Sequence, residues 1–140
     1  MPNVFKERVC PQCGVTKRMH PDQGFCSQTC SAQSKRDEKI RLWLDGGDVL
    51  TTRGKTATAH WIRDYLLEEC DYKCVKCGWG EMNPHTGKVP LELEHIDGDF
   101  TNNSRENLEI LCPNCHSLTA TYKGANKKAG RPRSKYYRGT

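Results

Sequence analysis

The sequence predicts a small α+β protein that is stabilised by bound zinc more than by an apolar core. Only 35% of its 140 residues are hydrophobic, so the chain forms one modest domain or two very small ones with little apolar surface to bury. Eight of its nine cysteines fall into two sets with short paired spacings, which are typical of structural zinc sites. An alternating segment at 91–96 and a short apolar run at 108–111 predict a β-hairpin.

The first cysteine set lies near the N-terminus. Two residues separate its first pair, three separate its second pair and twelve lie between the pairs, which are formed by Cys10, Cys13, Cys26 and Cys30. The N-terminus has no apolar signal segment, and no stretch approaches the roughly 20 apolar residues of a membrane span. We therefore expect a cytoplasmic protein with reduced thiols, in which these spacings indicate a zinc knuckle rather than disulfides. His20 could replace one thiolate, and the sequence leaves open whether this knuckle binds nucleic acid or only supports the fold.

Two helices are predicted between the cysteine sets. In the first, over 31–44, Ile40, Trp43 and Leu44 recur at helical spacing and Gly46-Gly47 end the helix. The glycine-rich, polar residues 45–58 are expected to form a linker.

The second predicted helix spans 58–69 and has Thr58 as its N-cap. Its apolar residues form one stripe, which is expected to face the core: Trp61, Ile62, Tyr65 and Leu66.

The second cysteine set surrounds the predicted hairpin. It consists of Cys74, Cys77, Cys112 and Cys115, and one zinc bound by both pairs would clamp the base of the hairpin. Four thiolates fill the coordination sphere of that ion, so any catalytic ion must bind elsewhere through oxygen and imidazole ligands, as Mg²⁺ or Mn²⁺ would. Cys70 is left over and is expected to be a packing residue or a free thiol.

The hairpin, its long polar loop and the residues after it carry three motifs in a fixed order. These are EHIDG from Glu94, ENLEILC from Glu106 and CPNCH from Cys112, and a helix is expected to begin in HSLTATY with His116 in its first turn. In residue type, order and spacing the motifs resemble those of the HNH endonucleases, and the run from the second helix into the zinc site resembles phage-encoded members.

That resemblance implies a ββα-metal, treble-clef-like module that follows an N-terminal zinc knuckle and helices. By position, His95 would be the general base, Asn107 the residue that pins the loop, and His116 a ligand of the catalytic ion. Glu94 occupies the place of a metal-binding Asp, although strict strand alternation sends Glu94 and His95 to opposite faces unless the strand bulges or ends there. The expected segments are a knuckle at 1–34, a helix and linker at 35–55, the nuclease module at 56–123 and a basic tail at 124–140.

The chemistry of phosphodiester hydrolysis requires these residue types. An imidazole with a pKa of about 6.5 can take a proton from water near neutral pH, and a cation held by an imidazole and a carboxylate keeps positions open for phosphate and water. Taken singly, His95 is better explained as a loop histidine and His116 as an extra neighbour of the zinc site, whereas the two together in this frame favour the nuclease.

The excess positive charge of the chain lies at its C-terminal end. Residues 1–116 carry 15 basic and 17 acidic side chains, whereas 117–140 carry seven basic and no acidic ones. This segment predicts a DNA-binding tail that includes Lys123, Lys127, Lys128, Arg131 and Arg133. Residues 130–133 resemble the core of an AT-hook, which reads the minor groove, but contact with phosphates at any sequence would explain them too.

We therefore expect a DNA endonuclease with two structural zinc ions and a catalytic Mg²⁺ or Mn²⁺. The resemblance implies double-stranded DNA as substrate, a location in the host cytoplasm if a phage encodes the chain, and a homing endonuclease among several roles. The chain gives no signal for a dimer, so a monomer that nicks one strand is the default. The alternatives are a zinc-finger DNA-binding protein without catalysis and, less favoured, cleavage of RNA.

Overall fold

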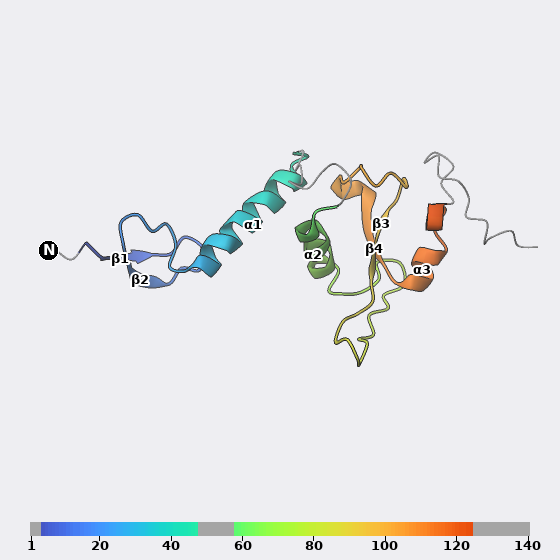
Figure 1. Ribbon diagram of the computed structural model, residues 1–140, viewed down its shortest axis with the longest axis horizontal. Coiled ribbons are helices and arrows are strands. Elements are labelled where there is room, and N and C mark those ends of the chain that lie inside the picture. The colour runs from blue at the N-terminus through green and yellow to red at the C-terminus, as the bar shows by residue number, and fades with distance from the viewer. Residues whose placement is uncertain (1–3, 48–57, 125–140) are drawn as a thin grey trace, which may run out of the picture. The chain divides into compact units, whose positions relative to one another are not determined.

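The computed structural model describes residues 4–47 and 58–124. The chain divides into two compact units, 1–49 and 50–140, whose elements are coloured in chain order in Figure 1. Residues 48–57 of the predicted linker and 125–140 of the predicted tail lie outside the described residues. Within the described part of the chain, no helix is both long and apolar enough to cross a membrane.

The first unit begins with a short antiparallel hairpin. Strand β1 (Lys6–Val9) pairs with β2 (Thr16–Met19), and the turn between them contains the first cysteine pair. Gly14 takes a φ of +72° in this turn, a backbone conformation that glycine adopts without strain.

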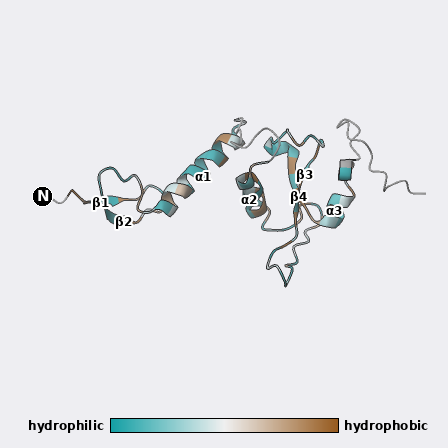
Figure 2. Ribbon diagram, viewed as in Figure 1, coloured by the Kyte–Doolittle hydropathy of each residue, from teal (hydrophilic) through white to brown (hydrophobic). Residues whose placement is uncertain are grey.

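Helix α1 (Gln28–Leu44) completes the first unit. It begins earlier than predicted because Ser27 caps it, accepting a hydrogen bond from the Cys30 amide. Ile40 and Trp43 are buried on it, while Leu44 is 43% exposed. Its end was predicted correctly: Gly46 takes a φ of +81° and donates from its amide to the carbonyl of Trp43. Figure 2 shows hydrophilic colours over much of α1, which agrees with its small apolar stripe.

The second unit opens with helix α2 (His60–Glu69). Ile62, Leu66 and Leu67 are its buried residues, so the predicted stripe is confirmed at two positions, and Leu67 joins them. Thr58 was wrongly predicted as the N-cap: Ala59 holds that position, because the Thr58 hydroxyl donates instead to Asn103 Oδ1 at 2.8 Å.

The predicted hairpin follows the second cysteine pair. Strand β3 (Glu92–His95) pairs antiparallel with β4 (Leu108–Leu111), with Glu94 opposite Glu109 and His95 opposite Leu108. The loop between the strands ends in a 3-10 turn, η1 (Arg105–Asn107).

The last α-helix of the second unit is short. Helix α3 (Pro113–Ser117) packs on both strands and is followed by the 3-10 turn η2 (Tyr122–Gly124). The prediction of a helix that begins at His116 was wrong in its limits, because Cys112 caps the helix and Pro113 takes its first position. His116 nevertheless lies in this helix.

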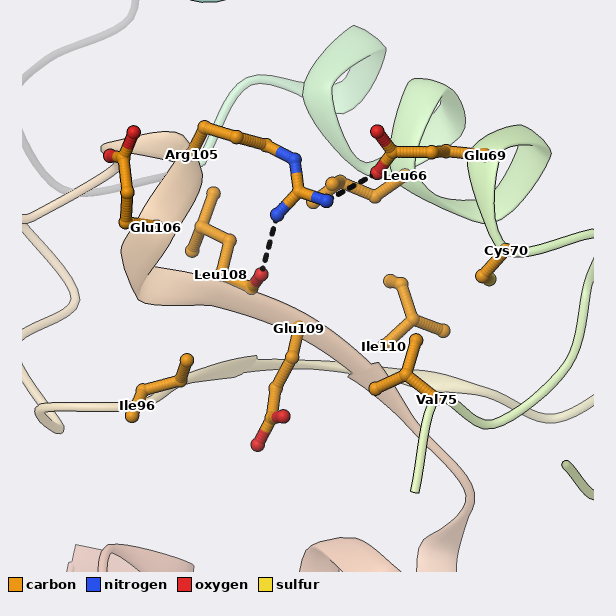
Figure 3. A pocket seen from close by; sticks show the side chains of 10 residues that line it. All are labelled: Leu66, Glu69, Cys70, Val75, Ile96, Arg105, Glu106, Leu108, Glu109 and Ile110. Atoms are coloured by element: carbon orange, nitrogen blue, oxygen red, sulfur yellow. Dashed lines mark hydrogen bonds and ion pairs between the residues drawn. The ribbon is translucent and has the colours of Figure 1, made fainter. Parts of the chain in front are cut away.

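The β3–β4 hairpin presents different side chains to α2 and to α3. Figure 3 shows Leu108 and Ile110 directed toward Leu66 of α2, and Glu109 directed away from it. On this side a cleft of about 270 Å³ is lined by the ends of α2 and β4, and Arg105 closes over it by an ion pair with Glu69. Because residues directly opposite each other in a hairpin share a face, His95 belongs with Leu108 on the α2 side, and Glu94 with Glu109 on the other.

Candidate active site and zinc centres

Both cysteine sets close into clusters of four. In each, the four sulfur atoms lie within 4.8 Å of one another, as they must around one tetrahedral ion with Zn–S bonds of about 2.3 Å. Within residues 4–47 and 58–124, no other group of three or more His, Cys, Asp or Glu side chains brings its ligand atoms so close together.

The first cluster combines a glycine turn with the start of a helix. Cys10 and Cys13 lie in the β1–β2 turn, and the Gly14 amide donates to the Cys10 carbonyl at 2.9 Å. Cys26 Sγ lies 3.5 Å from Cys13 Sγ and 3.5 Å from Cys30 Sγ, which α1 supplies from its first turn. His20, the alternative ligand, instead contacts Phe5 edge to face and pairs with Asp22 at 3.2 Å.

The second cluster is assembled from the same two parts. Gly78, with a φ of +75°, closes the turn after Cys77 and donates to the Cys74 carbonyl at 2.8 Å. Cys112 caps α3 and Cys115 lies inside it. Cys77 Sγ and Cys112 Sγ are 3.7 Å apart, so the cluster ties the turn before the hairpin to the helix after it.

The thiols within each cluster differ in pKa. Backbone N–H groups of Cys26 and Cys13 lower the pKa of Cys10 to about 6. Burial acts to raise the pKa of Cys74, but N–H groups of Cys112 and Cys77 outweigh it and lower the value to about 6. Neighbouring sulfurs raise the pKa of one further thiol in each cluster, Cys26 and Cys115, to about 12. A dication that replaces the shared protons would satisfy all four sulfurs, so both clusters fit zinc.

Glu94 and His116 meet on the α3 side of the hairpin. Glu94 is 7% exposed, and its Oε2 lies 2.7 Å from His116 Nε2. Neighbouring ligands of an octahedral ion, each about 2.1 Å from it, lie about 3 Å apart. The pair therefore has the donor types and the separation that a small dication such as Mg²⁺ or Mn²⁺ could bind.

Three residues around this pair escaped the sequence analysis. Thr121 donates its hydroxyl hydrogen to Glu94 Oε1, and Glu92 contacts His116 Nδ1. The Tyr122 ring packs edge to face on His116, with centroids 5.3 Å apart. Only Glu92 left a signal in the sequence, because it lies two positions before Glu94 and so on the same face of a strand.

His95 has different neighbours. Its Nε2 lies 2.9 Å from Asn103 Oδ1 and 3.4 Å from the Thr58 hydroxyl. The strand is regular and has no bulge at this point, so the alternation that separates His95 from Glu94 holds. The structure thus brings Glu94 and His116 together and places His95 with Asn103.

Asn107 is buried beneath the loop that joins the strands. Its Oδ1 accepts from the Asp97 amide at 3.0 Å, and its Nδ2 donates to Asp97 Oδ1 at 2.9 Å and to the Asn102 carbonyl at 2.8 Å. Hydrogen bonds from Asn102, from the Asp99 amide and from Asn107 lower the pKa of Asp97. These contacts tie the two ends of the loop together beside His95.

Of the predicted DNA-binding residues, the structure describes Lys123. Its Nζ lies 5.2 Å from the centre of the Tyr122 ring, so a cation stands next to the ring that packs on His116. Lys127, Lys128, Arg131 and Arg133 lie outside the described residues.

One curated relative carries a name that bears on this site. The H-N-H endonuclease F-TflIV of Escherichia phage T5 is 40% identical to this chain over 78 residues, which make up 52% of this chain and 32% of that protein. The chain thus spans about a third of the length of the relative that it matches. No family model and no solved structure matches the chain.

Proposed function

We propose that this chain, which is similar to an H-N-H endonuclease of a phage, is itself a metal-dependent endonuclease that hydrolyses phosphodiester bonds in double-stranded DNA. The proposed catalytic module spans residues 56–123, with a ββα-metal arrangement formed by β3, β4 and α3 and a structural zinc at its base. The basic residues from Lys123 onward supply affinity for the DNA. A homing role, and nicking by a monomer, belong to the same proposal.

One observation carries the assignment of the site. A nearly buried carboxylate, Glu94, and an imidazole, His116, face each other at 2.7 Å, although they come from a strand and a helix that are 22 positions apart in the sequence. Burial of a carboxylate is costly unless it is paired, and His116 and Thr121 supply the partners that Glu94 needs. Both lie within the motifs that resemble the nuclease family.

Glu94 and His116 would hold the divalent ion. When bound, such an ion neutralises charge on the phosphate and stabilises the leaving oxygen. The protein's own part is to keep the two ligands in place, through the Thr121 hydroxyl on Glu94 and the packing of Tyr122 on His116.

His95 would take the proton from the attacking water. Asn103 Oδ1 can only accept a hydrogen bond, so in the neutral imidazole the nitrogen beside it, Nε2, carries the hydrogen. The lone pair is then on Nδ1, which would be the basic atom. Thr58 donates to the same Asn103 oxygen at 2.8 Å and so helps to hold the amide in this orientation.

The proposal also locates the phosphate. His95 is the last residue of β3 and Glu94 the one before it, on opposite faces of the strand. A phosphate can approach both only at the end of the strand, beside the loop that Asn107 ties together. Asn107 would therefore act by holding this end of the hairpin in shape.

Cleavage of supercoiled plasmid tests the proposal. We expect nicking with Mg²⁺ or Mn²⁺, none in reactions without an added divalent ion, and a loss of at least about 100-fold in His95→Ala, because general-base catalysis contributes about 10² to 10⁴. Omitting the ion is preferable to adding a chelator, which would also remove zinc.

His85→Ala is the matched control, because His85 is exposed in the loop before the β3–β4 hairpin. This variant should cleave like the wild type. DNA binding without cleavage under either ion would favour a zinc-finger DNA-binding protein instead. Cleavage that survives His95→Ala would keep the enzyme and reject its base.

A further inference from the structure

His116 is held at both of its nitrogens by carboxylates of one strand. Glu92 and Glu94 are two positions apart on β3, so both point to the α3 side of the hairpin. The imidazole lies between them: its Nε2 faces Glu94 Oε2 at 2.7 Å, and its Nδ1 contacts Glu92 Oε2.

The two carboxylates have unequal surroundings. The Glu94 side chain is 8% exposed and also accepts from Thr121, whereas the Glu92 side chain is 49% exposed. His116 itself is only 20% exposed. Glu94 is thus built into the interior, and Glu92 reaches the ring from the solvent side.

The position of Glu92 does not suit a third ligand of the same ion. The two ring nitrogens of an imidazole point away from each other, so an ion at Nε2 is out of reach of a carboxylate at Nδ1. Among the described residues, Glu92 belongs to no group of three His, Cys, Asp or Glu ligand atoms that lie within 4.8 Å of one another. A carboxylate on the far nitrogen of a metal-binding histidine has another effect: it fixes the tautomer and the ring orientation and makes the free nitrogen a better ligand.

We propose that Glu92 is a positioning residue that accepts a hydrogen bond from His116 Nδ1–H and so presents the Nε2 lone pair to the divalent ion shared with Glu94. This inference depends on the proposed ion site and adds a residue to it. Tyr122, packed edge-on against the ring, limits its rotation from another side, so Glu92 chiefly sets which nitrogen carries the hydrogen.

Binding of Mn²⁺ to the zinc-loaded protein, followed by electron paramagnetic resonance without DNA, tests the proposal apart from activity. Glu92→Ala is expected to weaken Mn²⁺ binding about 10- to 100-fold, the usual loss when the carboxylate behind a metal-binding histidine is removed. Glu92→Gln keeps an acceptor oxygen and should lose less than Glu92→Ala. Glu81→Ala, which removes an exposed carboxylate from the preceding loop, should bind like the wild type, and Glu94→Gln should bind weakest.

Long-range ¹H–¹⁵N spectra of the histidines supply a readout that a purely structural role would not change. With saturating Mg²⁺, His116 should carry its hydrogen on Nδ1, and in the wild type the bond to Glu92 should protect this hydrogen from exchange with water. Glu92→Ala should lose the protection while zinc content and melting temperature stay near wild-type values.

The outcomes separate this inference from the proposed function. A wild-type protein that binds no Mn²⁺ would remove the ion site and the proposed metal dependence with it. Wild-type binding that Glu92→Ala leaves unchanged would overturn the role of Glu92 alone. A larger loss in Glu92→Gln than in Glu92→Ala would also overturn it, because a retained acceptor should help.

Discussion

In the proposed mechanism, each histidine of the candidate site is positioned through one nitrogen and acts through the other. His95 faces Asn103 through Nε2 at 2.9 Å, and His116 faces Glu92 through Nδ1. The first arrangement would leave Nδ1 of His95 as the proposed basic atom, and the second would present Nε2 of His116 as the proposed ligand atom. The supporting residues therefore decide which role each imidazole can take, since an imidazole alone is suited to both.

Thr58 provides a test of the arrangement at His95. Its hydroxyl donates to Asn103 Oδ1 at 2.8 Å, and removing one such hydrogen bond costs about 0.5 to 1.5 kcal/mol. Thr58→Val, which keeps the shape of the side chain, should slow cleavage at saturating DNA and metal about 2- to 10-fold. Thr58→Ser keeps the hydroxyl and should stay near the wild-type rate. Equal single-turnover rates for the two variants would show that the hydroxyl plays no part.

Two short elements, a glycine turn and a helix start, form each cluster of four cysteines. A turn with a positive-φ glycine after its second cysteine supplies one pair, and the first turn of α1 or α3 supplies the other. In the second unit the ends of this clamp lie before β3 and after β4, and Leu108, Ile110 and Leu111 are buried between. With so few apolar residues, the binding energy of the ion becomes folding energy.

Cys112→Ser separates the zinc site from the helix cap. Serine is also a good N-cap, so the substitution removes a zinc ligand but still provides a cap for α3. We expect the variant to bind one zinc fewer per chain and to unfold the second unit. Cys70→Ser is the matched control, because Cys70 Sγ donates to the Leu67 carbonyl at 3.4 Å at the end of α2 and lies outside both clusters. Zinc analysis and circular dichroism measure both effects, and a Cys112→Ser protein that retains its zinc and fold would refute the ligand assignment.

Over the whole molecule, the charges are arranged unevenly. Residues 1–116 carry more acidic than basic side chains, and the excess of basic residues lies in 117–140. The candidate site itself adds carboxylates at Glu92 and Glu94, which repel a phosphate until a cation is bound. In the proposed function, affinity for DNA must therefore come largely from basic residues outside the candidate site.

Deletion of residues 124–140 tests where that affinity lies. The deletion removes six basic residues, and each phosphate contact contributes about 0.9 to the slope of log K against log salt concentration. Binding should weaken and the slope should fall by up to about five, while the rate at saturating DNA stays near the wild-type value. A full-length variant with the same six residues changed to Gln should reproduce the deletion. An unaltered slope would mean that the tail does not contact DNA.

Features that depend on neighbours in the sequence were predictable. The spacing of the cysteines predicted both clusters, because each pair needs only one turn of chain. Alternation predicted β3, a short apolar run predicted β4, and helical spacing predicted α1 and α2, whereas the β1–β2 hairpin was not predicted. The starts of α1 and α3 were missed, since they depend on which side chain caps the helix: Ser27 in one case and Cys112, followed by Pro113, in the other.

The partners of the site residues were decided only by the tertiary structure. Thr58 lies 37 positions before His95, and Asn103 lies 8 positions after it. Glu92 lies 24 positions before His116, and Thr121 lies 27 positions after Glu94. Such contacts follow from how the strands, the loop and the helix pack, and no local pattern encodes them. The sequence by itself therefore determined which residues are candidates for the chemistry and which cysteines cluster. The fold decided which side chain faces each nitrogen of the two histidines, because that depends on residues brought together from distant parts of the chain.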